Sequence, residues 1–231
     1  MWQGLFYDSL RRITTPNLRL WFKMQKWFVP LSKLIFGNTV YSKSYFEDIE
    51  RLEGQSMDYI ADWICEYLKP MRIIDCGCGS GQLMLCLHQR NVDVFGVDVA
   101  PAAIKMAQEK GLPAKIFDLT NSGDILPGIP YDLVISCEVA EHLDEKHART
   151  FVQKLSMAAP IVYLTAASPC FEGCRGLYHV NEKPNSYWIA LMEEFNFQLD
   201  QKATSEVRNT LRKESVISYL QNPMIFRLHQ G

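Results

Sequence analysis

Long uncharged apolar stretches are missing from this sequence of 231 residues. None reaches the roughly 20 residues that a transmembrane helix needs. The first residues also lack a signal peptide's order of charge, apolar run and small-residue cleavage site. The seven cysteines are an odd number, and several lie inside apolar stretches, where cysteine usually packs as a small hydrophobe. We therefore expect a reduced, cytoplasmic protein without a disulfide framework.

A strong net charge and a clear zinc-binding pattern are missing as well. Lys and Arg number 24 and Asp and Glu number 26, so the net charge is −2 and no overall field recruits nucleic acid. Cys170 and Cys174 are close enough in sequence to form a metal or redox pair, but no second pair has ligand spacing. We expect no zinc site at these cysteines.

Residues 1–43 differ from the rest of the chain in charge. They carry seven basic residues and one acidic residue, a balance of +6, which leaves −8 for residues 44–231. The segment is also rich in Trp and Phe, and Pro16 and Pro30 divide it into short helical pieces. Basic residues interleaved with aromatic ones suit peripheral contact with an anionic membrane surface. The alternative, which we prefer, is a lid or a homodimer arm whose aromatic residues pack on the domain.

From residue 44 onward, short apolar runs alternate with stretches of helical period. Helices are predicted at residues 56–68, 81–89, 101–110, 145–157 and 186–194. Strands are predicted at residues 71–75, 92–97, 114–117, 131–137, 161–166, 197–199 and 224–228. This order predicts an α/β fold, in which a doubly wound, mostly parallel seven-stranded sheet occupies residues 44–231 behind an N-terminal helical extension.

A glycine-rich turn follows the first predicted strand and reads Asp75-Cys-Gly77-Cys-Gly79-Ser-Gly81. Glycines at alternate positions let the backbone turn sharply and approach a ligand closely. The helix that follows offers free N–H groups at its N-terminus. Ligands of a doubly wound sheet bind at the carboxyl ends of its strands. The turn therefore predicts a nucleotide-like ligand.

The residues around this turn narrow the ligand further. Position 82 is Gln where a dinucleotide fingerprint needs Gly, and the phosphate-loop pattern is absent. Asp98 ends the second predicted strand, where a carboxylate can accept both ribose hydroxyls. Asp118 ends the third, in a position to accept from an adenine amino group. Together these features indicate adenosine without a diphosphate.

The series resembles the class I S-adenosylmethionine methyltransferases, whose first motif is a hydrophobic strand ending in D-x-G-x-G-x-G, over about residues 45–229. The resemblance implies S-adenosylmethionine as the cofactor. It implies cofactor contacts from Gly77, Gly79 and Gly81 at the methionine end, Asp98 at the ribose and Asp118 at the adenine. Tyr45 and Phe46 are similar to an upstream segment that closes over the cofactor. The other residues expected in this site are Asp75, Cys78, Val99, Leu119, Cys137 and Glu138.

The richest group of titratable residues follows the fourth predicted strand and reads Cys137-Glu138-Val-Ala-Glu141-His142-Leu. The spacing E-x-x-E-H resembles the ubiquinone-pathway O-methyltransferases and the small-RNA 2′-O-methyltransferases. That resemblance implies that Glu138, Glu141 and His142, with His179, hold a divalent cation that acidifies a bound hydroxyl. The alternative, which we prefer at the level of sequence, has no metal. In it a glutamate orients the backbone and a histidine acts as base or packs.

Residues 179–192 and 222–227 resemble a branch of small class I enzymes that act on small molecules and glycan-type acceptors. The loop at residues 168–184 would then wall an acceptor pocket, and His179 is either a base there or a loop histidine bonded to backbone. We predict an S-adenosylmethionine-dependent O-methyltransferase with Glu141, His142 and His179 as catalytic candidates. The alternatives are a nitrogen or carbon acceptor, and a non-catalytic subunit that keeps the fold. The acidic domain has no basic stripe, so we expect no nucleic-acid partner.

Overall fold

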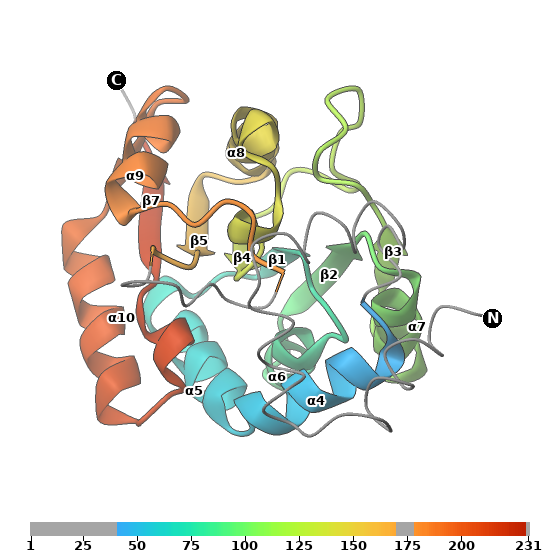
Figure 1. Ribbon diagram of the computed structural model, residues 1–231. Coiled ribbons are helices and arrows are strands. Elements are labelled where there is room, and N and C mark those ends of the chain that lie inside the picture. Colours follow the sequence, from blue (N-terminus) through green and yellow to red (C-terminus); the bar gives the residue numbers. More distant parts are fainter. Residues whose placement is uncertain (1–40, 170–177, 230–231) are drawn as a thin grey trace.

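The computed structural model describes residues 41–169 and 178–229 of the chain. The interpretations of residues 1–40 and of the Cys170 and Cys174 pair lie outside the described residues. In the described part, helices cover both faces of a central sheet, so the predicted α/β architecture is confirmed (Figure 1).

Seven strands form the sheet in the order β3-β2-β1-β4-β5-β7-β6. Their bounds are β1 Arg72–Cys76, β2 Asp93–Asp98, β3 Ala114–Ile116, β4 Leu133–Cys137, β5 Ile161–Thr165, β6 Phe197–Leu199 and β7 Met224–Leu228. Strands β1 to β5 pair in parallel, whereas β7 runs antiparallel to both β5 and β6. The winding direction reverses between β1 and β4, and open sheets of this kind bind ligands at such a switch point.

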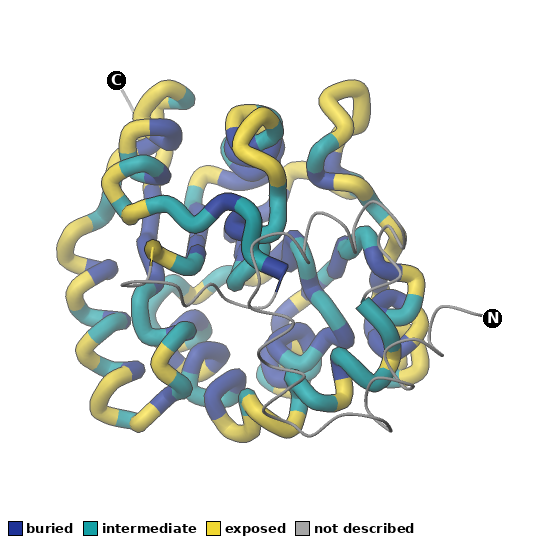
Figure 2. Tube along the Cα trace, viewed as in Figure 1, coloured by how far each residue is buried: buried dark blue, intermediate teal, exposed yellow. Residues whose placement is uncertain are grey.

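The helices divide between the two faces of the sheet, and each face has its own hydrophobic cluster. The first face carries α5 (Ser56–Trp63), α6 (Gln82–Gln89), α7 (Pro101–Glu109) and α10 (Gln201–Lys213). The second carries α8 (Ala148–Ala158) and α9 (Asn185–Glu193). Figure 2 shows the result as buried strands inside helices whose outer surfaces are exposed. Of the helices in these described ranges, none has the length and apolarity to cross a membrane.

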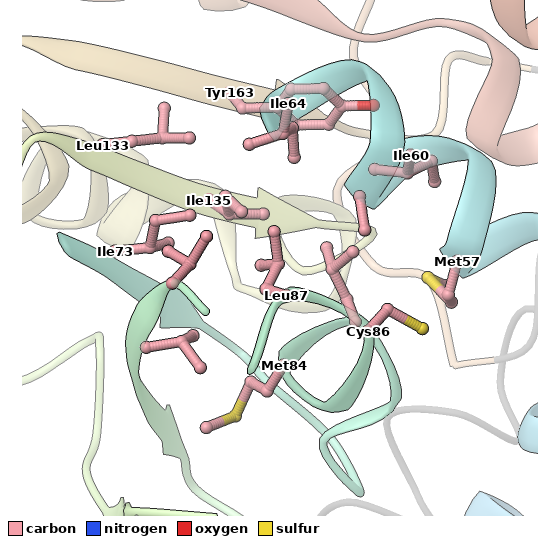
Figure 3. Close-up of a cluster of buried hydrophobic side chains, with 14 of the residues drawn as sticks. Met57, Ile60, Ile64, Ile73, Met84, Cys86, Leu87, Leu133, Ile135 and Tyr163 are labelled. Carbon is pink, nitrogen blue, oxygen red and sulfur yellow. The ribbon is translucent and has the colours of Figure 1, made fainter. Parts of the chain in front are cut away.

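The core beneath the first face is built from large apolar side chains of helix α5 and the sheet. Ile60 of α5 and Ile64 of the π-helical turn that continues it (Ile64–Leu68) lie close to Tyr163 and Ile135 of the strands (Figure 3). Each aliphatic side chain buried to this degree contributes about 1.5–3 kcal/mol relative to an exposed one. This packing fixes where the carboxyl ends of β1, β4 and β5 lie.

Two helices in the described part were not predicted from the sequence. Helix α10 begins at the N-cap Asp200, whose side chain accepts from Ala203 N at 2.9 Å, and it buries residues at helical spacing. Helix α4 (Lys43–Glu53) buries Phe46 and is otherwise mostly polar, so its periodicity is a weak signal. Strand β3 also ends at Ile116, so Asp118 lies beyond the strand rather than at its end.

Candidate functional site

A cavity of about 540 Å³ lies at the carboxyl ends of the parallel strands. Sites for cofactors and small molecules commonly have volumes of roughly 300–1,000 Å³. Its walls are the turns that follow β1 to β4, helix α4 and the 3-10 turn η5 (Ser218–Gln221). Eleven of the residues expected at the cofactor line it: Tyr45, Asp75, Gly77, Cys78, Gly79, Asp98, Val99, Asp118, Leu119, Cys137 and Glu138.

The glycines of the turn after β1 have different roles. Gly77 has φ 88°, and a Cβ there would lie 2.2 Å from Cγ2 of Val139, so this turn packs directly on the turn after β4. Gly81 has φ 81° but is not among the described residues that line the cavity. A Cβ on Gly81 would lie 2.8 Å from Cδ1 of Leu112. The structure therefore places Gly81 in the packing between α6 and the chain after α7.

Asp98, at the end of β2, is held by the backbone of two neighbouring turns. Its Oδ2 accepts from Gly79 N at 2.9 Å and its Oδ1 accepts from Ala100 N at 2.8 Å. Burial raises the pKa of Asp98, and the backbone N–H groups partly offset this. Each carboxylate oxygen keeps a second acceptor position. This arrangement fits a pair of ribose hydroxyls.

The turn after β3 supplies the wall expected for the adenine. Leu119 is buried and Phe117 is half-buried, and both line the cavity. Asp118 is exposed, and its Oδ1 accepts from both the backbone N–H and the hydroxyl of Thr120, at 2.8 and 2.6 Å. These two bonds fix the carboxylate of Asp118, and both use Oδ1, so Oδ2 takes part in neither of them. An apolar wall beside one oriented acceptor suits a planar base with an amino group.

Helix α4 and the residues just before it contribute an aromatic wall to the cavity. The Tyr41 ring lies 5.5 Å from that of Tyr45 and 6.0 Å edge-on from that of His142, measured between centroids. Phe46 packs against α7, next to Ala103. The sequence placed Tyr41 in the N-terminal extension, and nothing local in the sequence distinguishes it from the other aromatic residues there.

A lysine ties α4 to the glycine turn. Lys110 Nζ lies 2.5 Å from Oε1 of Glu50 on α4 and donates to the carbonyl oxygen of Ser80 at 2.8 Å. Both members of this ion pair are half-buried. The aromatic wall is therefore fixed relative to the turn that is expected to hold the cofactor.

Acidic groups dominate the charge of the cavity. Five carboxyl groups line it, those of Glu53, Asp75, Asp98, Asp118 and Glu138. Among the described residues, no Lys or Arg lines it. Burial raises the pKa of Glu53 to about 7 despite a hydrogen bond of 3.2 Å from Tyr219 Oη. Burial, followed by the charges of Asp98 and Glu53, raises the pKa of Asp75 to about 7. Such a cavity favours a positively charged ligand, as a sulfonium is.

Glu53 and Tyr219 were not predicted as site residues. They are 166 positions apart in the chain. A pairing at that separation depends on how α4 and η5 pack, and neither residue stands in a motif.

Two carboxyl groups follow β4, that of the half-buried Glu138 and that of the buried Glu141. Glu138 has φ 55°, in the left-handed region that costs a non-glycine residue energy, and its N–H donates to Thr165 Oγ1 at 3.0 Å. Glu141, in the 3-10 turn η3 (Ala140–His142), is fully buried behind the cavity lining. Neither oxygen of Glu141, nor Oε1 of Glu138, has a hydrogen-bond partner in the described structure. Burial, and then the neighbouring carboxylate of Glu138, raises the pKa of Glu141 well above its usual range.

Two histidines complete this group. Glu141, His142 and His179 each bring one atom that could bind a metal, a carboxylate oxygen or a ring nitrogen, to within 4.8 Å of the other two. Such a group could hold a metal ion. His179 Nε2 lies 3.9 Å from Glu141 Oε1, and the two imidazole rings meet edge to face at 4.8 Å between centroids. His142 and His179 also line the cavity. The structure thus brings together the three catalytic candidates and places Glu138 beside them.

Known proteins share both the sequence pattern and the fold. Residues 73–158 match the family model described as a methyltransferase domain. A ubiquinone biosynthesis O-methyltransferase of Roseobacter denitrificans is 28% identical over 163 residues, which are 64% of this chain. The chain spans 60% of the length of that relative.

Two solved structures show the same fold at low identity. A magnesium protoporphyrin IX methyltransferase of Synechocystis, with bound S-adenosylhomocysteine, aligns with TM-score 0.55 and 19% identity over 74% of this chain and 80% of its own. A sugar N-methyltransferase of Streptoalloteichus aligns with TM-score 0.58 and 13% identity, over 77% of this chain and 88% of its own.

The fold, the lining of the cavity and the matching family model all indicate the same class of protein. Residues 73–158 match a methyltransferase domain, and the chain has the fold of the class I methyltransferases, whose cofactor is S-adenosylmethionine. Within the class, its sequence is similar to the ubiquinone biosynthesis O-methyltransferases. The residues of this chain fit the cofactor, because the cavity combines an oriented pair of ribose acceptors with an acidic lining.

Proposed function

We propose that this protein transfers the methyl group of S-adenosylmethionine to a hydroxyl oxygen of a small-molecule or glycan-type acceptor. The observation that supports the transfer is that the expected cofactor residues and the pair His142 and His179 line one cavity. When bound, the cofactor supplies an electrophilic methyl carbon. The acceptor oxygen forms a bond to that carbon, the sulfur–methyl bond breaks with its electron pair left on sulfur, and the hydroxyl proton passes to solvent.

The chain's own contribution is mainly position and charge. Methyl transfer is an in-line displacement, so much of the rate comes from holding the two reactants at the right distance and angle. Asp98 and the turn at Gly77 orient the cofactor, while the histidines bound the space where an acceptor would lie. The acidic lining favours the sulfonium over the product, which has lost that charge.

We also propose that Glu138, Glu141, His142 and His179 hold a divalent cation beside the acceptor. A buried carboxyl group without hydrogen-bond partners is stabilised either by a proton or by a nearby cation, and Glu141 is fully buried with neither oxygen bonded in the described structure. Carboxylate and imidazole ligands suit Mg²⁺, Mn²⁺ or Zn²⁺. When bound, such an ion would lower the pKa of the acceptor hydroxyl. This geometry favours the metal interpretation over the metal-free one preferred from the sequence.

Calorimetric titration with S-adenosylmethionine and S-adenosylhomocysteine tests the transferase proposal. We expect both to bind at one site per chain, and mass spectrometry to detect a singly methylated product. Absence of binding by either compound would contradict the proposal and favour a non-catalytic subunit. For the cation, activity of chelator-treated protein should return when Mn²⁺ or Mg²⁺ is added. Full activity without any ion would contradict the cation proposal, and His142 or His179 would then be the candidate base that takes the hydroxyl proton.

The aromatic wall indicates what kind of acceptor to test. Tyr41, Tyr45 and His142 line the cavity, and their rings contact one another edge to face; aromatic walls of this kind suit planar or sugar rings. A panel of phenols, sugars and amino sugars, each assayed with labelled cofactor, separates oxygen from nitrogen acceptors. We expect turnover with hydroxyl compounds; turnover confined to amines would contradict the choice of oxygen.

We propose in addition that residues 1–40 make peripheral contact with anionic membranes from the cytoplasmic side, the interpretation that the sequence ranks second to a lid or homodimer arm. The support is the balance of +6 over residues 1–43 together with their Trp and Phe content. Weak binding to vesicles with anionic lipid should be lost when residues 1–40 are deleted. Equal binding by the shortened protein would contradict the contact. A change from dimer to monomer on the same deletion would support the alternative, a dimer arm.

A further inference from the structure

The segment that carries His179 is fixed to the turn after β4 by its backbone. The carbonyl oxygen of Glu141 accepts from Val180 N at 2.8 Å and from Asn181 N at 2.9 Å. Tyr178, at the start of the segment, has φ 63°, a conformation that costs energy for a residue with a side chain. Residues 178–182 are therefore held against the same residue whose carboxylate belongs to the candidate cation site.

Both histidines of that site have the same ring nitrogen occupied. His142 Nδ1 lies 3.2 Å from the carbonyl oxygen of Tyr178, and His179 Nδ1 lies 2.8 Å from Oε1 of Glu182. A carbonyl oxygen and a carboxylate can only accept, so Nδ1 carries the hydrogen in both rings. When either imidazole is neutral, its lone pair lies on Nε2. For His179, Nε2 is the atom that lies 3.9 Å from Glu141.

Glu182 is well placed to control His179. Its side chain is 10% exposed and that of His179 is 14% exposed, so solvent competes little for the bond between them. A carboxylate bonded to the far nitrogen of a metal-binding histidine fixes the ring and makes the ligating nitrogen more basic, and its loss commonly costs about 10–100-fold in metal affinity.

We propose that Glu182 is a positioning residue that fixes the tautomer and orientation of His179 and thereby sets the affinity of the site for a divalent cation. The inference rests on the proposed cation site. Glu182 does not belong to the group Glu141, His142 and His179 whose ligand atoms converge. It acts through His179, and no motif in the sequence marks it.

The test is a titration of full-length, chelator-treated protein with Mn²⁺, in which electron paramagnetic resonance measures the concentration of the free ion. We expect the Kd to rise about 10–100-fold in Glu182→Ala, and less in Glu182→Gln, which keeps an acceptor for Nδ1–H but loses the charge. Glu182→Asp should recover part of the affinity. The matched control is Glu145→Gln, because Glu145 pairs with the adjacent Lys183 at 2.7 Å and is 60% exposed. It should bind Mn²⁺ like the unmodified protein.

A second measurement separates positioning from a general effect on the fold. In metal-free protein, nitrogen-15 chemical shifts of His179 should report hydrogen on Nδ1, and this preference should weaken in Glu182→Ala. S-adenosylhomocysteine affinity should stay within about twofold in every variant, which also shows that each is folded.

The outcomes are distinct. If the unmodified protein binds no Mn²⁺, the cation proposal fails and this inference fails with it. If the unmodified protein binds Mn²⁺ and Glu182→Ala binds it equally well, the cation proposal stands and the role of Glu182 is overturned. The role of Glu182 is also overturned if the tautomer of His179 is unchanged in Glu182→Ala, or if Glu145→Gln loses as much Mn²⁺ affinity as Glu182→Ala.

Discussion

The cofactor end and the acceptor end of the cavity are built in different ways. At the cofactor end, backbone groups dominate, and the bond from Gly79 N to Asp98 joins consecutive strand–helix turns only 19 residues apart. At the acceptor end, side chains dominate, and the contact of His142 with Tyr178 joins segments 36 residues apart. The first arrangement is nearly local, whereas the second requires the segment at 178–182 to return to the turn after β4.

This difference teaches which part of such a protein sets its chemistry. A backbone cradle with one carboxylate can hold the same cofactor in many chains of the class. In the proposed function, carboxylates and imidazoles brought together by the tertiary fold act on the acceptor. Changes at the two ends should therefore have separable effects.

The largest effect is expected from removing a candidate cation ligand. Glu141→Gln or His142→Ala should lower kcat/KM by about 10³-fold. The ion would stabilise the transition state by several kcal/mol, and each 1.4 kcal/mol corresponds to about a tenfold change in rate. Affinity for S-adenosylhomocysteine should change little. Steady-state kinetics and calorimetry on the same samples check both parts. A parallel loss of cofactor affinity would break the comparison.

Asp98→Ala should weaken cofactor binding by about 100-fold, since hydrogen bonds to a charged group are worth about 1.5–3 kcal/mol. The turnover of cofactor-saturated protein should fall much less. Asp118→Ala is the matched variant, because Asp118 is exposed and one of its oxygens is already bonded to Thr120. We expect it to lose less affinity; equal losses would contradict the central place given to Asp98.

Gly77→Ala should destabilise the fold by about 1–3 kcal/mol, because its positive φ strains any side chain and the new Cβ would lie 2.2 Å from Val139. Denaturant unfolding measures the change. Adding Val139→Ala should restore part of the loss by making room. If the second substitution restores nothing, the contact between the two turns is not the cause.

The smallest effect concerns pH. Glu53 and Asp75 have pKa values of about 7 in the folded state, above the values of about 4 that they have when unfolded. Between these values the folded state binds more protons, so their contribution to stability is lost as pH rises from about 4 through 7. Without ligand, Tm should therefore be lower at pH 8 than at pH 6. Asp75→Asn should reduce this difference; an unchanged difference would contradict the assignment.

Most of the fold could be predicted from the sequence, because the apolar strands and the periodic helices are local signals. The strands of the parallel sheet appeared within a few residues of their predicted places, and Pro101 begins α7 as expected. Helix α4 could not be predicted well, since Phe46 is its buried residue and the rest of the helix is mostly polar.

The site was predictable to different depths at its two ends. The glycine turn and Asp98 stand in a compact motif, whereas the packing of Gly81 against Leu112 depends on the tertiary fold. The sequence suggested Glu141 and His142 as neighbours, but their burial, which favours a cation, is a property of the folded core. Glu182 became visible only through its bond to His179.

The most direct test of the two-ended cavity is one set of calorimetric titrations, with Mn²⁺ and with S-adenosylhomocysteine, on three proteins. We predict that the unmodified chain binds both, that a Glu141→Gln, His142→Ala variant loses Mn²⁺ and keeps S-adenosylhomocysteine, and that Asp98→Ala does the reverse. Absence of Mn²⁺ binding by the unmodified chain, or loss of both ligands in either variant, would contradict the account.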